Sequence, residues 1–448
     1  MRHLKIYLVL LAAFIAQLFF VFKEHPIWWD SSIYLGMGHY IYSLGAVGIW
    51  EPIRPLVWPL LLGFFWKTGL NDIFMGYVLG IIFSLGSVFV AYHIGKKLHN
   101  EDAGLIAALI LAFTPVFFES FFMNLTELPS IFFALLAVYL FLDKKHLMAG
   151  AFAGISFLTK FPNGILIAIL VIIALIYFKA KDAGKIFAGS LVVIIPYLVF
   201  NYIMYGNILN VFIEADAIVK NAGTWLFSGP WYYYIIELLK QNPLYVLALV
   251  GAYELITRKK YIIPALGFLF LAYFSIHVHK EIRFGILMLP YIAVMAGFGI
   301  KSLFKQKWII LPVLFVVLTV FAFNLPSDYG LSNEAEGYLS FLEGKDVEGE
   351  VLTMQPAVNL YSSKAVIPMY YPVFNAELAD KWIDYIKKDA NKISYVFIDT
   401  CEGGMVCAPE DSICNEKKEE LAMFLKETFN IAYYAERETC EYYVFESL

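Results

Sequence analysis

Five ionisable side chains lie within residues 277–284, which read HVHKEIRF and stand between two largely apolar stretches. Arginine offers phosphate a planar fork of N–H donors, and lysine offers it a point charge. The segment therefore predicts a phosphate site in which Lys280 and Arg283 bind the anion. His279 is expected to join them, and Glu281 to orient the cations. The alternative is an interfacial cluster whose cations reach toward anionic lipid headgroups.

Two acids elsewhere in the sequence are candidates for proton chemistry. Asp30 follows two tryptophans and opens a helical pattern over residues 31–44, so it suits both a helix N-cap and a general base. One residue can do both. Glu127 stands in a turn just before another helical pattern, where the helix dipole favours an acid.

The amino-acid composition indicates the environment in which these ionisable residues lie. Of the 448 residues, 60% are hydrophobic and only 16% are charged, against roughly a quarter charged in soluble proteins. This excludes an ordinary cytosolic enzyme, a disordered chain and a small disulfide-rich protein. The net charge of −5 also argues against nucleic acid as a partner, because duplex binding needs a basic surface.

Apolar stretches of about the length that crosses a bilayer follow one another through the first part of the chain. They cover residues 4–22, 74–95, 103–121, 129–142, 147–160, 163–178, 186–204, 233–256, 261–276, 284–300 and 307–325. With a cytoplasmic N-terminus, interpreted as a retained anchor, every inner segment between them holds at least two cations. This is the positive-inside pattern. An odd number of spans then places the C-terminal tail outside.

The charge distribution divides the chain into two predicted domains. Residues 1–325 carry a net charge of +8, and residues 326–448 carry −13. The second part alternates strand-like runs at 350–354, 393–399 and 442–445 with helical runs at 379–388 and 416–429, as in a small α/β domain. We therefore expect a transmembrane domain over 1–325 and a soluble extracytoplasmic domain over 326–448.

All cysteines of the chain lie in this tail, at Cys401, Cys407, Cys414 and Cys440. An oxidising compartment favours two disulfides, and three connectivities remain open. Metal ligation is the alternative, although the spacing lacks the close Cys pairs of zinc sites.

The predicted topology also decides between the two interpretations of residues 277–284. It puts the segment outside, whereas attraction to anionic lipid is mainly a property of the cytoplasmic leaflet. A specific phosphate site is therefore favoured.

Two stretches resemble the GT-C glycosyltransferases. Asp30, Tyr34 and residues 54–62 (RPLVWPLLL) are similar to the first outer loop of the protein mannosyltransferase and lipid A aminoarabinose transferase group, in which an RPPLYPLLL-like stretch follows an acid. Residues 279–284 (HKEIRF) resemble the HKExRF motif of dolichyl-phosphate-mannose α-mannosyltransferases. This sequence has Asp-Ser where the eukaryotic protein mannosyltransferases have Asp-Glu, so the acceptor stays open between a protein and a lipid-linked glycan.

The resemblance implies a sugar donor on a polyprenyl or dolichyl phosphate, used at the outer face of the membrane. Asp30 would be the base that activates the acceptor, and Glu127 would help to position it. Lys280 and Arg283, with His279 and Arg54, would hold the donor phosphate, and Tyr34 and Glu281 would support them. Such a reaction requires no cofactor, although Asp30 and Glu127 could share a divalent cation.

These inferences predict an α-helical polytopic membrane protein of about eleven transmembrane helices, GT-C-like, with a small C-terminal α/β domain. The expected function is an inverting glycosyltransferase, with mannose as one candidate sugar and membrane lipids as its surroundings. The alternative is a transporter or flippase of a lipid-linked or anionic substrate. A transporter places its polar groups near the bilayer midplane, whereas the polar candidates of this chain lie at the outer ends of spans.

Overall fold

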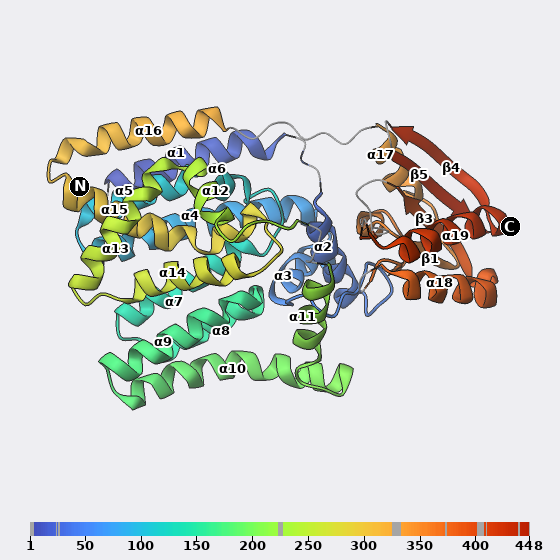
Figure 1. Ribbon diagram of the computed structural model, residues 1–448, viewed down its shortest axis with the longest axis horizontal. Helices are drawn as coiled ribbons and strands as arrows, with labels where there is room; N and C mark the ends of the chain where they lie inside the picture. The colour runs from blue at the N-terminus through green and yellow to red at the C-terminus, as the bar shows by residue number, and fades with distance from the viewer. Residues whose placement is uncertain are drawn as a thin grey trace.

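The computed structural model of the protein describes residues 4–23, 25, 27–222, 227–324, 333–371, 374–400, 407–408, 410–437 and 440–447. Figure 1 shows a bundle of helices with a small sheet-containing domain at one end. The chain begins at the opposite end of the bundle. This is the predicted fold class, a helical membrane-protein architecture with a C-terminal α/β domain.

The helical part has short connections and one long apolar core. Its α-helices are α1 (Leu4–Val21), α2 (Trp29–Tyr42), α3 (Val57–Lys67), α4 (Asp72–Leu98), α5 (Glu101–Ala112), α6 (Pro115–Glu119), α7 (Glu127–Leu142), α8 (His146–Thr159), α9 (Gly164–Tyr177), α10 (Ala180–Tyr205), α11 (Asn210–Ala222), α12 (Tyr233–Gln241), α13 (Ala248–Thr257), α14 (Ile262–Ile276), α15 (Leu289–Leu303) and α16 (Ile310–Phe323). Short 3₁₀ segments precede α9 and α15, η1 (Phe161–Asn163) and η3 (Ile282–Leu287).

The described helices differ from the predicted spans mainly where proline intervenes. By length and composition, α1, α4 and α10 could each cross a membrane. The predicted span 233–256 is instead α12 and α13, bent by 118°, because Pro243 lacks an N–H and forces Asn242 into an extended conformation. Pro115 divides the predicted span 103–121 in the same way. The count of eleven spans stays a prediction.

Ion pairs join the predicted cytoplasmic loops to one another. One pair joins Lys97 to Asp143. Two others join Lys301 to Asp102 and His146 to Asp182, each at 3.1 Å. Helix ends that the cation pattern assigns to one face are therefore neighbours in space. The arrangement agrees with the predicted alternation of loops, while the side of the membrane on which each face lies remains a prediction.

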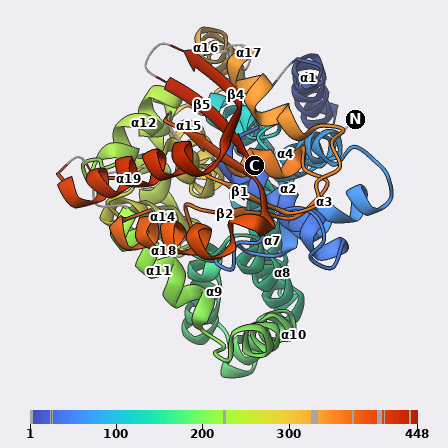
Figure 2. The same cartoon turned by 90° about the vertical axis from the view of Figure 1, so that its right-hand side faces the viewer.

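The C-terminal domain is built on a mixed five-stranded sheet, in the order β2-β1-β3-β5-β4. Its elements are α17 (Asn333–Leu339), β1 (Glu350–Thr353), β2 (Val366–Pro368), α18 (Ala376–Asp389), β3 (Ile393–Asp399), α19 (Ser412–Thr428), β4 (Asn430–Arg437) and β5 (Cys440–Glu446). The predicted strands appear as β1, β3 and β5, and the predicted helices as α18 and α19. Figure 2 shows this domain in front of the bundle.

The described cysteines of the tail are disulfide-bonded, in agreement with the favoured prediction. Cys407 is bonded to Cys414, and Cys440 is disulfide-bonded as well. Cys401 lies outside the described residues, and no described cysteine is free.

The loop between α2 and α3 joins the sheet of the C-terminal domain. The N–H groups of Ala365 and Val366 donate to the carbonyls of Ala46 and Gly48, both at 2.8 Å. Gly48 has a φ of +95°, and a Cβ there would lie 2.1 Å from the carbonyl oxygen of Gly36, so only glycine fits. The predicted domain boundary at 325/326 falls in residues that the structure does not describe.

Candidate active site

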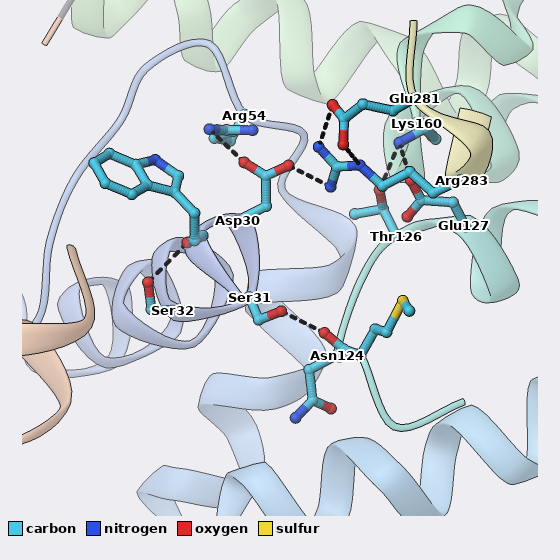
Figure 3. A network of polar contacts seen from close by, with 12 residues as sticks. Asp30, Ser31, Ser32, Arg54, Asn124, Thr126, Glu127, Lys160, Glu281 and Arg283 are labelled. Carbon is cyan, nitrogen blue, oxygen red and sulfur yellow. Dashed lines mark hydrogen bonds and ion pairs between the residues drawn. The ribbon is translucent and has the colours of Figure 1, made fainter. Parts of the chain in front are cut away.

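Asp30 lies in the first turn of α2, with its carboxylate between two arginines (Figure 3). Its Oδ1 is 2.9 Å from Nη2 of Arg54, and its Oδ2 is 2.6 Å from Nη1 of Arg283. The N-cap of α2 is Trp28, without a side-chain cap hydrogen bond. Asp30 is therefore not the helix cap in this structure, and its side chain is free for another role.

Arg54 contacts a second acid as well as Asp30. Its Nε donates to Oε2 of Glu51 at 2.9 Å, and its guanidinium carbon lies 5.8 Å from the ring centre of Tyr34. Tyr34 is buried. Glu51 and Tyr34 thus fix the direction in which Arg54 points.

Arg283 is held in a matching way by its own segment. Its Nε and Nη2 donate to the two carboxylate oxygens of Glu281, at 2.7 and 2.9 Å. The Nε2 atom of His279 lies 2.6 Å from Oε1 of the same carboxylate. In this structure His279 therefore contacts Glu281, and the fork formed by Arg283 and Glu281 presents one N–H to Asp30.

Glu127 starts α7 and pairs with a lysine from the end of α8 (Figure 3). Nζ of Lys160 lies 2.8 Å from Oε1 of Glu127 and 5.4 Å from the ring centre of Phe284. Glu127 is only 1% exposed, and its Oε2 has no hydrogen-bond partner in the described part of the chain. The pair is nearly desolvated, so each charge depends on the other.

The charges in this cluster nearly balance. Burial alone would raise the pKa of Asp30, but the charges of Arg54 and Arg283 outweigh it and hold that pKa well below its usual range. Burial acts on Glu281 in the same way, and its hydrogen bond from His279 and the charge of Arg283 lower its pKa. Asp30 is therefore a carboxylate at any physiological pH.

Lys280 is the predicted phosphate ligand that the structure places elsewhere. Its side chain is buried, and its ammonium donates to the carbonyls of Phe274 and Ser275 at 2.8 and 2.9 Å and to that of His277. An ammonium has three N–H donors, and here all of them cap the C-terminus of α14. A phosphate contact from Lys280 therefore has no support in this geometry.

An apolar groove of about 390 Å³ lies at the end of α8. It is lined by Phe157, Phe161, Pro162, Ile165, Phe212 and Tyr273. Phe157 and Phe161 flank Lys160 in the sequence, so the groove and the charged cluster share the end of α8. Its lining suits a hydrocarbon chain.

The sequence interpretation did not include Glu51 and Lys160 among the site residues. A signal for Glu51 was present, since it stands three residues before Arg54 in a Pro-rich loop. Lys160 is a single cation between apolar runs, with no acid close to it in the sequence. Its partner Glu127 is 33 residues away, which sequence spacing does not reveal.

The surroundings of the cluster offer no evident metal site. Among the residues that the structure describes, no group of three or more His, Cys, Asp and Glu side chains is arranged to hold a metal ion. The predicted divalent cation between Asp30 and Glu127 thus stays a prediction.

The fold of the chain is similar to that of proteins of known structure. Residues 53–205 match the family model described as dolichyl-phosphate-mannose-protein mannosyltransferase. The crystal structure of ArnT from Cupriavidus metallidurans bound to undecaprenyl phosphate is similar over 98% of this chain and 97% of its own, with a TM-score of 0.69 and 11% identity. The chain has the GT-C fold that the sequence predicted.

Two further solved structures share the fold. Archaeal oligosaccharyltransferase AglB from Archaeoglobus fulgidus, in complex with an inhibitory peptide and a dolichol-phosphate, matches with a TM-score of 0.63 and 11% identity, over 98% of this chain and 74% of its own. Arabinofuranosyltransferase AftD from Mycobacteria matches with a TM-score of 0.54 and 12% identity, over 98% of this chain and 41% of its own. No curated protein sequence is significantly similar to the chain.

Proposed function

We propose that the protein is an integral-membrane glycosyltransferase that moves a sugar from a polyprenyl-phosphate donor to an acceptor hydroxyl at the outer face of the membrane. One observation carries the proposal: the Asp30 carboxylate is held between Arg54 and Arg283, beside an apolar groove. A base, two phosphate-binding cations and a lipid-binding surface are the parts that such a reaction needs.

The reaction requires one base and no general acid. The acceptor oxygen attacks the anomeric carbon, and the bond from that carbon to the phosphate oxygen breaks with inversion. The bonding electrons leave with the polyprenyl phosphate, a stable anion, and Asp30 takes the acceptor proton. Arg54 and Arg283 stabilise the charge that grows on the phosphate, which is the electrostatic contribution that dominates in many enzymes.

The two ion pairs of Asp30 imply how donor binding changes its basicity. A carboxylate with so low a pKa is a weak base. A donor phosphate competes with Asp30 for both guanidinium groups, and each arginine that turns toward the phosphate leaves Asp30 more basic. Donor binding thereby makes Asp30 a stronger base, while Glu51 and Glu281 keep both arginines within reach of the phosphate.

Two further features support the choice of donor. The structures of ArnT and AglB were determined with undecaprenyl phosphate and dolichol-phosphate, and the groove next to Lys160 suits the same kind of chain here. Glu127 and Lys160 lie beside Arg283, where they position the sugar or the acceptor. The family model's description points to mannose as the first sugar to test.

Purified protein offered a panel of radiolabelled polyprenyl-phosphate sugars tests the proposal. The expected result is release of free polyprenyl phosphate and transfer of the label, with inverted configuration, to a membrane glycan or protein fraction. Adding EDTA is expected to leave the transfer rate unchanged. If every donor binds but stays intact, or if the protein moves the intact lipid across vesicles, the enzyme assignment is wrong.

The predicted topology needs a separate experiment. Protease added to sealed right-side-out vesicles should remove the domain after residue 325 and leave the bundle. A protected C-terminal domain would overturn the outer location of the site.

A further inference from the structure

Two adjacent tyrosines of the C-terminal domain contact two different parts of the membrane bundle. The hydroxyl of Tyr370 donates to Oε1 of Glu51 at 2.8 Å, and the hydroxyl of Tyr371 donates to Oε2 of Glu214 at 3.0 Å. The sequence analysis assigned no role to either tyrosine, and the reaction outlined above does not use them.

Tyr370 begins a chain of contacts that ends at Asp30. Glu51 is 1% exposed, and it accepts the Tyr370 hydroxyl on one oxygen and Nε of Arg54 on the other, at 2.9 Å. A buried carboxylate with both oxygens bonded has a fixed orientation. Arg54 is thereby aimed so that its Nη2 reaches Oδ1 of Asp30. The ring of Tyr370 also packs on Trp29, with ring centres 4.7 Å apart.

Tyr371 leads to the apolar groove instead. Its partner Glu214 belongs to α11, and the second oxygen of Glu214 accepts from Nδ2 of Asn210 at 2.6 Å. Phe212, between these two residues, lines the groove beside Phe157 and Phe161. Tyr371 therefore fixes the helix that forms one wall of the groove.

We propose that the C-terminal domain positions both halves of the active site, with Tyr370 setting the orientation of Arg54 against Asp30 through Glu51 and Tyr371 holding α11 against the apolar groove. Both tyrosines are positioning residues, because neither touches the reacting atoms. The kinetic part of this inference rests on the proposed glycosyltransferase function, whereas the contacts themselves do not.

Docking of the domain does not depend on the two hydroxyl groups. The sheet pairs with the α2–α3 loop through Ala365 and Val366, and Nδ2 of Asn359 donates to the carbonyl of Ser32 at 3.0 Å. Replacing tyrosine with phenylalanine keeps these contacts and the buried ring. The variants Tyr370→Phe and Tyr371→Phe therefore test positioning rather than assembly.

The two variants should separate turnover from donor binding. Tyr370→Phe leaves a buried carboxylate oxygen unpaired, so kcat should fall by about tenfold, whereas KM for the donor should change less because Arg283 still binds the phosphate. Tyr371→Phe should raise KM for the donor by roughly three- to tenfold with kcat nearly unchanged. The matched control is Tyr395→Phe. It removes a hydroxyl that donates to Glu446 at 2.9 Å in an exposed contact of the C-terminal domain.

The pH profile gives a second readout for Tyr370. A loosened Arg54 depresses the pKa of Asp30 less, so the acid limb of kcat/KM should move to higher pH in Tyr370→Phe and stay in place in Tyr395→Phe. The other groups that face Asp30 or its arginines are unchanged by the substitution: Arg283 and Glu281 after α14, Glu127 at the start of α7, Lys160 at the end of α8, and Glu51 and Tyr34 beside Arg54. Glu51→Gln combined with Tyr370→Phe should be no worse than Glu51→Gln alone, because both act through one chain of contacts.

Hydrogen exchange keeps this inference separable from the proposed function. Backbone amides of residues 46–56 should exchange faster in Tyr370→Phe, and those of α11 faster in Tyr371→Phe, than in Tyr395→Phe. If these differences occur in a protein that transfers no sugar, the glycosyltransferase proposal fails and the positioning contacts stand. If transfer occurs and both variants match Tyr395→Phe in kinetics and exchange, the positioning role is overturned.

Discussion

Replacing Asp30 with asparagine should move turnover and lipid binding in opposite directions. Asparagine keeps the shape of the side chain and removes its charge, so the base is lost while Arg54 and Arg283 no longer have a carboxylate between them. A positioned general base contributes about 10²- to 10⁴-fold, and kcat should fall by that factor. Affinity for the lipid phosphate should rise, because the anion no longer competes with Asp30.

The size of the gain in lipid affinity follows from the two ion pairs that Asp30 makes. The side chains of Asp30, Arg54 and Arg283 are 16%, 19% and 15% exposed, so the pairs lie between the surface and the buried limit. A surface pair is worth about 0.2–1 kcal/mol, and two such pairs at the upper end contribute about 1–2 kcal/mol. Since 1.4 kcal/mol is a factor of ten, Asp30→Asn should bind undecaprenyl phosphate roughly 5- to 30-fold more tightly.

Binding and transfer can be measured on the same preparation. The assay is titration of purified protein in lipid nanodiscs with undecaprenyl phosphate, followed by transfer from the donor that the panel identifies. Asp380→Asn is the matched control, because it removes the same charge from an exposed pair with Lys417 on the C-terminal domain. Weaker lipid binding in Asp30→Asn would refute competition for the arginines, and full turnover would refute Asp30 as the base.

Three further outcomes are expected. Lys160→Met should lower the free energy of unfolding by about 3–5 kcal/mol, because Glu127 stays buried without its partner, and adding Glu127→Gln should restore most of it in thermal denaturation. Burial would raise the pKa of Asp30, but the charges of Arg54 and Arg283 hold it below its usual value of about 4. The contribution of Asp30 to stability is therefore complete above about pH 4 and is lost only as pH falls further, and between pH 7 and 5 the melting temperatures of wild type and Asp30→Asn should keep a constant difference. Gly48→Ala should lower the free energy of unfolding by at least about 2 kcal/mol, since the positive φ of Gly48 and the carbonyl of Gly36 exclude a Cβ. A melting temperature equal to that of wild type would contradict the pairing of this loop with the sheet.

Much of the fold could be predicted because the bilayer imposes simple rules. The lengths of the apolar stretches and the positions of the cations between them located most helices of the bundle. Short strand-like runs between helical ones located the strands β1, β3 and β5. The bend at Asn242 was missed because an apolar run of 24 residues over 233–256 reads as one span unless Pro243 is given priority. Strand β4 was missed because it is partly exposed at the sheet edge, so its side chains alternate weakly between apolar and polar.

The sequence identified the residue types of the candidate site more readily than the pairings between them. Charge sorting drew attention to the cations left among the predicted outer segments, of which it placed Lys280 in the site and left Lys160 out. A lysine just beyond the end of a helix meets several unpaired carbonyls within its own segment, and Lys280 is bound there at a separation of only three to six residues. Lys160 also follows the end of a helix, but its ammonium reaches Glu127, 33 residues away. Arg54 and Arg283 likewise have acids close to them in the sequence, Glu51 and Glu281, and each arginine still directs one N–H group at Asp30. The contact between Arg283 and Asp30 spans 253 residues, so it follows from the packing of the bundle and not from any sequence spacing.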